Sequence, residues 1–241
     1  MKHYRLLAAT LLLASICSAG DALPVWAAKK PGWVLHQNSQ TYGIVKCTVS
    51  EDGIKMEMGN VKVGIVPPKW RFTFWNEKTN FFYEESLEEF QKRVPRKILD
   101  PGWVRKLEPL KPYVETISGI KTKNWNWYGV DPKNPKKTRL LYEFSCTNEM
   151  GLSKKLMEVA SICCYLPPGK GMPLRVIGEN ASGKKVFLNT TFVSKTMVDP
   201  AIFKLPKGYT RVKNEMEVLL KKKGTVMDED VSDLYRPFPK E

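Results

Sequence analysis

The fold is decided by the sequence YGIVKCTVSEDGIKMEM at positions 42–58. Apolar and polar residues alternate on both sides of Asp52-Gly53, and this period of two is typical of a half-buried β-strand. An Asp-Gly pair between two such runs is a strong hairpin signal, because both residues tolerate the positive φ angles of a tight turn. We therefore expect an antiparallel hairpin, with Val45, Cys47 and Val49 on one face of its first strand.

Strand-like alternation continues beyond this hairpin through residues 61–65, until Pro67-Pro68 interrupts it. Residues 70–75 and 81–83 are rich in aromatic side chains and flank the polar run 76–80, so they predict a second hairpin. The first half of the chain therefore predicts an antiparallel sheet that is built in sequence order.

A capping box, Ser86-Leu87-Glu88-Glu89, predicts the start of a short helix that Pro95 ends. In a capping box the Ser hydroxyl and the Glu carboxylate satisfy each other's free backbone amides. Residues 96–112 contain three further prolines, and we expect them to form an irregular connector with at most a short helical turn.

The second half of the chain repeats these signals. Strands are expected around the turn-rich run 131–135. A helix is expected over residues 152–165, where apolar residues recur every three or four positions, and Pro167-Pro168 ends it. Residues 174–198 predict a last hairpin.

Residues 1–28 are predicted to be a cleaved signal peptide. Lys2 and Arg5 form a positive start, residues 6–19 form an apolar core, and Val25-Trp26-Ala27 offers a cleavage end of the small-x-small type. We therefore expect the mature protein in the periplasm or in another extracytoplasmic compartment.

The remaining chain is expected to form one folded domain and a tail. The composition is that of an ordinary globular protein, with 42% apolar residues, and residues 29–220 suit a single domain. Residues 221–241 are polar and poor in core-forming side chains, which predicts a mobile tail.

The chain carries a formal net charge of +14, with basic pairs such as Lys136-Lys137 and Lys184-Lys185 spread along it. Such a charge favours anionic partners, which for a cytosolic protein would suggest nucleic acid. Export argues against nucleic acid and favours the phospholipid headgroups of an anionic membrane surface, or an acidic glycan. The alternative is a solvated basic surface that only aids solubility.

Four cysteines follow the leader, and an even number in an oxidising compartment permits two disulfides. Cys163 and Cys164 are adjacent, and a bond between neighbouring residues is strained. Each is therefore expected to pair with one of Cys47 and Cys146, in either combination. The alternative is a set of four reduced, buried thiols.

Catalytic and metal sites find little support in the sequence. His36 is the one histidine beyond the leader, and neither a zinc site nor a hydrolytic triad is expected from a single histidine. The acidic residues 84–89 resemble paired catalytic acids, but acids at a helix start are also stabilised by the helix dipole. We therefore expect a protein that is not an enzyme and that needs no metal and no cofactor.

Residues 196–209, TMVDPAIFKLPKGY, resemble the closing element of the exported LolA/LolB-like half-barrel proteins. Residues 72–76 with 81–83, and residues 171–175, are also similar to motifs of that family. The resemblance implies an α+β fold in which a curved antiparallel sheet forms an incomplete barrel. It also implies helices that cover the concave side of the sheet, an apolar cavity between them, and carriage of lipoproteins or lipid-like molecules.

The leading hypothesis is therefore a non-enzymatic, extracytoplasmic protein that binds a lipid or another apolar small molecule. The expected cavity lies between one face of the second helix and a wall of strand residues. The candidate residues are Leu152, Leu156 and Val159 on the helix, and Phe72, Phe74, Tyr142 and Phe144 on the strands. The aromatic residues have an alternative role as ordinary core.

Two other classes of function remain open. One is an envelope structural or interaction protein whose basic face contacts anionic lipid or glycan, and whose interior is simply packed. The other is a hydrolase that acts without histidine.

Overall fold

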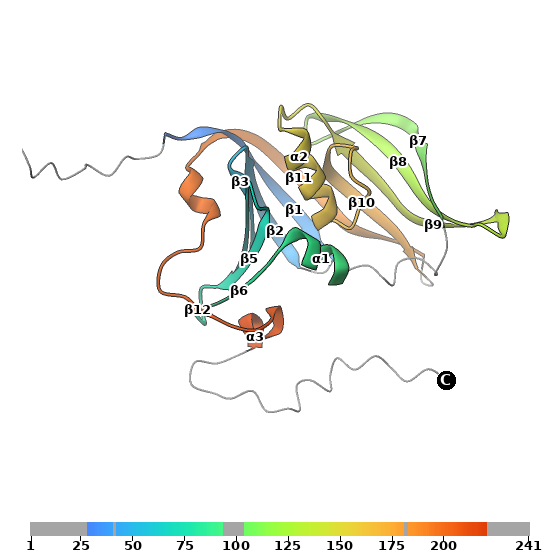
Figure 1. Cartoon of the computed structure of the whole chain (residues 1–241). Coiled ribbons are helices and arrows are strands. Elements are labelled where there is room, and N and C mark those ends of the chain that lie inside the picture. The colour runs from blue at the N-terminus through green and yellow to red at the C-terminus, as the bar shows by residue number, and fades with distance from the viewer. Residues whose placement is uncertain (1–27, 41, 94–103, 181–182, 221–241) are drawn as a thin grey trace, which may run out of the picture.

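The computed structural model describes residues 28–40, 42–93, 104–180 and 183–220. The predicted signal peptide, apart from Ala28, and the predicted tail at 221–241 lie outside the described residues. Figure 1 shows one large curved sheet with short helices lying against it.

The described residues form twelve strands, three α-helices and one short 3-10 helix. The strands are β1 (Lys30–Ser39), β2 (Gly43–Ser50), β3 (Gly53–Met58), β4 (Val61–Val66), β5 (Arg71–Asn76), β6 (Phe81–Glu85), β7 (Val104–Ile117), β8 (Ile120–Asp131), β9 (Asn134–Thr147), β10 (Met172–Asn180), β11 (Gly183–Val198) and β12 (Thr210–Arg211). The helices are α1 (Leu87–Arg93), α2 (Lys154–Cys163), η1 (Pro200–Phe203) and α3 (Glu215–Leu220).

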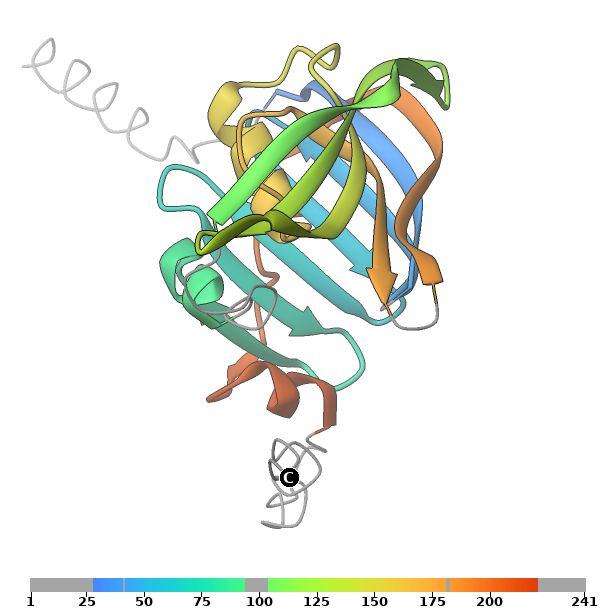
Figure 2. The same ribbon diagram turned by 90° about the vertical axis from the view of Figure 1, so that its right-hand side faces the viewer.

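All the strands belong to one sheet in the order β12-β6-β5-β4-β3-β2-β1-β11-β10-β9-β8-β7. Neighbouring strands are antiparallel, except for the short parallel pair of β12 and β6. The two halves of the chain meet where β1 pairs with β11. The end strands β7 and β12 do not pair with each other within the described residues, so the sheet is curved but unclosed (Figures 1 and 2). The expectation of a curved, unclosed antiparallel sheet is thus confirmed.

The local signals in the first half of the chain act where they were expected. Gly53 pairs with Ser50 at the turn between β2 and β3 and has a φ of 150°, which L side chains rarely adopt. The Ser86 amide donates to the Glu89 carboxylate over 2.6 Å, and the Glu89 amide donates to Ser86 Oγ over 3.1 Å. The predicted capping box is therefore formed, and α1 starts at Leu87.

The expectation of an irregular connector over 96–112 is wrong from residue 104 onward, because that part of the chain belongs to strand β7. β7 is an edge strand that pairs with β8 alone, and edge strands tolerate proline because one side of the strand needs no amide donors. The register breaks between Pro109 and Val114, where the Pro112 carbonyl instead accepts a hydrogen bond of 2.7 Å from Asn124 Nδ2. Residues 96–103 lie outside the described residues.

The helix predicted over 152–165 is present as the shorter α2. Ser153 caps its start by accepting a hydrogen bond from the Leu156 amide over 3.4 Å. Leu156 and Val159 on α2 are fully buried and belong to the larger of the two main hydrophobic clusters. α2 therefore packs against one face of the sheet through the stripe that the periodicity indicated.

That face of the sheet is a continuous apolar surface in its first half. One residue from each of seven neighbouring strands lies opposite the next in register. The series runs Val193, Leu35, Cys47, Met56, Val63, Phe74 and Tyr83. A smaller cluster forms around Trp127, Phe144 and Cys146 in the second half.

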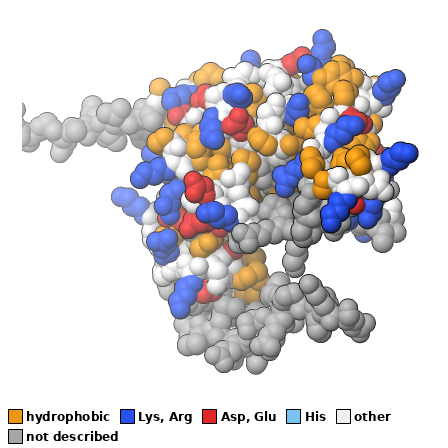
Figure 3. Space-filling model, turned by 45° about the vertical axis from the view of Figure 1, so that its right-hand side comes forward, with side chains coloured by type: hydrophobic (Ala, Val, Ile, Leu, Met, Phe, Trp, Pro, Cys, Tyr) orange, Lys and Arg blue, Asp and Glu red, His pale blue; other side chains and the backbone are white. Residues whose placement is uncertain are grey.

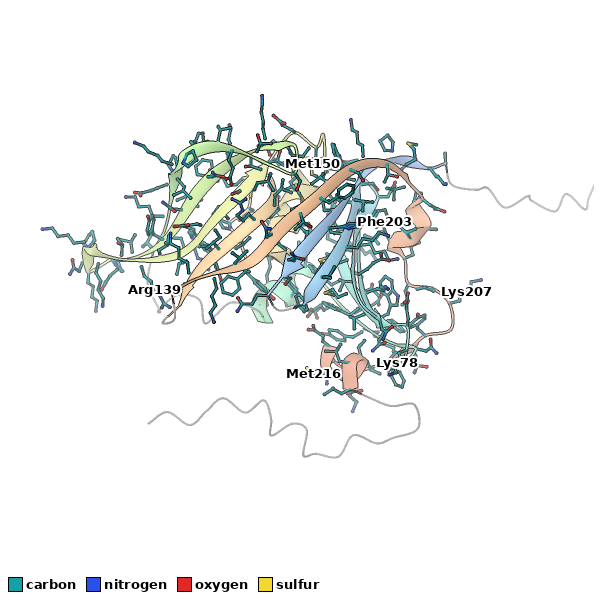
Figure 4. The ribbon with its side chains drawn as sticks, turned by 180° about the vertical axis from the view of Figure 1, so that it is seen from behind. Lys78, Arg139, Met150, Phe203, Lys207 and Met216 are labelled. Atoms are coloured by element: carbon teal, nitrogen blue, oxygen red, sulfur yellow. The ribbon has the colours of Figure 1, made fainter. Side chains whose placement is uncertain are left out.

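The opposite face of β3 and β4 is covered by the closing element of the chain. Phe203 of η1 is buried against Gly53 and Gly64. A Cβ atom at Gly53 would lie 3.1 Å from the Phe203 ring, and one at Gly64 would lie 2.3 Å from the Phe203 carbonyl oxygen. Figure 4, in which Phe203 is labelled, shows it beside the strands of this half of the sheet. Beyond η1, the Thr210 amide of β12 donates to the Asn80 carbonyl over 2.8 Å.

Candidate functional site

The main candidate site is a cavity of about 350 Å³ on the same face of the sheet as α2. Its wall is mostly apolar and comes from β3, β4, β5, α1, α3 and the C-terminal end of α2. Its lining includes Met56, Met58, Phe72, Phe74, Phe90 and Tyr165. The volume is within the range of about 300–1,000 Å³ that is usual for sites of small molecules and cofactors.

A smaller cavity of about 120 Å³ adjoins the main one towards β9, β10 and β11. Both are lined by Met56 and Met58 of β3 and by Cys163 and Tyr165 at the end of α2. Tyr142 of β9 lines the smaller cavity. Together the two spaces extend along the sheet from α3 to β11.

Stacked aromatic rings form one wall of the main cavity. The Phe72 and Phe90 rings are 4.3 Å apart between centroids and lie within 10° of parallel. The Phe90 and Tyr165 rings are 6.1 Å apart, also within 10° of parallel. Phe90 reaches this position because the capping box starts α1 immediately after β6. The stack therefore connects β5, α1 and the end of α2.

The structure brings some of the predicted site residues to the cavities and not others. Phe72 and Phe74 line the main cavity, and Tyr142 lines the smaller one. Phe144 is buried in the smaller hydrophobic cluster and lines neither.

The predicted helix residues have a different position from the one expected. Leu152, Leu156 and Val159 are packed in the larger hydrophobic cluster and line neither cavity. α2 instead reaches both cavities with its C-terminal end, at Cys163 and Tyr165. The apolar stripe of α2 thus anchors the helix, and the end of the helix borders the open space.

The sequence interpretation missed Met56, Met58 and Tyr165. The two methionines alternate on β3 and were recognised only as strand residues. Both are half-buried and lie beside both cavities, and an unbranched thioether adapts easily to the shape of an apolar ligand. Tyr165 has a φ of 59°, which redirects the chain just after α2.

The four cysteines are free thiols, and they are divided between the two main hydrophobic clusters. Cys47 and Cys163 pack in the larger hydrophobic cluster, while Cys146 and Cys164 pack in the smaller one. Burial raises the pKa of the Cys47 thiol to about 12, with a smaller contribution from Cys164. Burial also raises the pKa of Cys164 to about 12.

Burial raises the pKa of Cys163 well above its usual range, with smaller contributions from Cys164 and Cys47. The pKa of Cys146 rises through burial and, to a smaller extent, through Cys164. These thiols stay protonated near neutral pH, and a protonated thiol is a poor nucleophile.

The side chains considered for catalysis are spread over the surface of the sheet. His36 on β1 is exposed and meets the Phe192 ring edge-on, with ring centroids 5.3 Å apart. Glu84 accepts a hydrogen bond of 3.2 Å from the Thr73 hydroxyl and lies 3.6 Å from Arg71 Nη2. In the part of the chain that the structure describes, no three His, Cys, Asp or Glu side chains are grouped so that they could hold a metal ion.

The helices within the described ranges are all too short or too polar to cross a membrane. No protein-family model matches the chain, and no curated protein matches it in sequence.

Proposed function

We propose that the protein is a non-enzymatic, extracytoplasmic carrier that binds a lipid or another apolar ligand in the two adjoining cavities. The observation that carries the proposal is the main cavity, which opens beside half-buried methionine and aromatic side chains of a curved, unclosed sheet. In a sheet that does not close on itself, apolar residues of the inner face must be covered by helices or by a ligand. The proposal agrees with the LolA/LolB-like resemblance.

In this proposal α2 covers one part of the concave side of the half-barrel, and the ligand covers another part of the same side. The anchoring stripe of α2 packs into the larger hydrophobic cluster, and the helix lies against β10. Beyond the helix end, Met56, Met58 and Tyr165 are only half-buried. An apolar chain in the cavity would remove these side chains from water, which supplies about 25 cal/mol for each Å² of apolar surface.

Displacement of a fluorescent fatty acid tests the proposal. Met58→Trp places a large ring in the cavity, so it should weaken probe binding at least about tenfold. Met197→Trp is the matched control, because Met197 is exposed on β11 and lines neither cavity. Loss of binding in Met58→Trp with normal binding in Met197→Trp supports the site. A wild-type protein that binds no apolar probe, and whose native mass spectrum shows no co-purified lipid, removes the carrier proposal.

A second candidate function is an envelope protein that contacts anionic lipid or glycan. One observation favours it: on the part of the surface formed by β7, β8 and β9, basic and hydrophobic side chains lie side by side (Figure 3). Lys170 Nζ lies 4.0 Å from the centroid of the Trp125 ring, and Lys123 Nζ lies 5.8 Å from that of Tyr113. Sedimentation with anionic vesicles, which should weaken as salt is raised, tests this function; equal binding to zwitterionic vesicles contradicts it.

A further inference from the structure

A third cavity, of about 460 Å³, lies beside the main one and differs from it in chemistry. Phe90 and Tyr165 line both, so the two spaces meet at this stacked ring pair. The third cavity is also lined by Arg105 at the start of β7 and by Trp127 of β8. We call it the Arg105 cavity.

Arg105 brings an available positive charge to this cavity. Its Cζ atom lies 5.2 Å from the centroid of the Trp127 ring, which holds the guanidinium against an aromatic surface. Arg105 is exposed, and no carboxylate of the described residues forms an ion pair with it. Several other basic side chains, such as Lys106 and Arg175, are already paired with glutamates.

Trp127 lines the same cavity and carries a buried polar atom. Its side chain is only 2% exposed, and its indole Nε1 is buried without a hydrogen-bond partner among the described residues. Buried polar groups in folded proteins are nearly always satisfied by protein, water or ligand. The exposed guanidinium of Arg105 at the edge of the cavity favours an acceptor that carries negative charge. A planar carboxylate or a phosphate group fits the donor fork of arginine.

We propose that the ligand is an anionic amphiphile whose carboxylate or phosphate head binds in the Arg105 cavity, while its apolar chain lies in the main cavity. The Phe90 and Tyr165 rings then separate head from chain. This inference rests on the proposed function, because it assigns the second end of the same ligand.

Three probes of equal chain length separate the contribution of the charged head from that of the apolar chain. They are a long-chain fatty acid, its methyl ester, and the corresponding alkyl phosphate. The wild-type protein should bind the acid or the phosphate about tenfold more tightly than the neutral ester, as a charge-assisted hydrogen bond allows. The tighter of the two anions identifies the head. Arg105→Gln should remove this preference and leave binding of the ester unchanged. Arg105→Lys keeps the charge and should retain part of the preference.

Lys121→Gln is the control for charge alone, because Lys121 is exposed on β8 and does not line the Arg105 cavity. Equal affinity of the wild type for ester and anions overturns the inference while leaving the carrier proposal intact. The same conclusion follows if Arg105→Gln weakens all three probes equally, or if Lys121→Gln has the effect of Arg105→Gln. Failure of the wild type to bind any of the probes overturns both proposals.

Discussion

At the scale of single residues, Phe203 shows how the closing element fastens itself to the sheet. Phe203 is 1% exposed; its ring packs where Gly53 of β3 has no Cβ, and its backbone carbonyl packs where Gly64 of β4 has none. Phe203→Ala should lower the free energy of unfolding by about 3–5 kcal/mol, because a large cavity replaces the ring. Phe192→Ala is the matched control, since the Phe192 ring is half exposed, and it should cost less than about 1 kcal/mol. Equal losses in urea unfolding would contradict this role of Phe203.

Substitution of Leu156 tests whether the apolar stripe of α2 belongs to the core or to the ligand site. Leu156 is fully buried and lines neither cavity. Leu156→Trp should therefore overpack the core and lower the free energy of unfolding by about 1–3 kcal/mol. Met58→Trp, in the cavity, should cost less stability and more ligand affinity. Calorimetry and probe displacement on both variants give the comparison. A Leu156→Trp protein of normal stability that binds no probe would place Leu156 in the ligand site after all.

At the scale of secondary-structure elements, local signals were sufficient wherever a short segment determines its own conformation. The Asp52-Gly53 turn and the capping box at Ser86 are of this kind, and both are formed as predicted. β7 was not predictable, because its prolines are tolerated only at an edge, and edge position depends on the order of the whole sheet.

The residues of the candidate site also fall into two groups, those that the local sequence predicts and those that depend on the arrangement of the whole sheet. Phe72, Phe74 and Tyr142 could be predicted, because strand alternation indicates which aromatic residues face inward. The periodicity of α2 could show an inward stripe, but not whether that stripe meets packed core or open space. That distinction depends on where the C-terminal end of α2 lies over the sheet, so Met58 and Tyr165 were missed.

Helix α3 holds the last described turn of the chain against β5 and β6. Val218 is 1% exposed, and its carbonyl accepts hydrogen bonds from Asn76 Nδ2 at 3.2 Å and Thr79 Oγ1 at 3.3 Å. Truncation after Leu220 should leave the melting temperature within a few degrees, because the residues removed are mostly polar. Truncation after Asn214 removes α3 and should lower the melting temperature by about 4 °C or more. Equal melting temperatures of the two truncated proteins would show that α3 contributes nothing to stability.

At the scale of the whole molecule, the cysteines show how an oxidising compartment would act on this fold. Each of the two main hydrophobic clusters contains one strand cysteine and one cysteine from the end of α2. If two disulfides form, as the sequence predicts, this arrangement favours Cys47 with Cys163 and Cys146 with Cys164. Both bonds would tie the end of α2, which borders the cavities, to strands from the two halves of the sheet. Ligand entry would then depend on movement elsewhere than at this end of the helix.

Peptide mapping of the freshly exported protein under non-reducing conditions tests this pairing. Four alkylatable thiols would contradict the disulfides, and the opposite combination would contradict the assignment.

The pH dependence of the melting temperature gives a second measurement. In the free-thiol protein, burial raises the pKa of Cys47 and Cys164 from 9.0 to about 12. The unfolded chain therefore releases these protons first, and the stability that the buried thiols contribute below pH 9 is lost as the pH rises towards 12. The oxidised protein has no thiols to titrate, so its melting temperature should exceed that of the reduced protein by a margin that grows between pH 9 and pH 11. A constant margin would mean that the thiols ionise alike in the folded and unfolded chains.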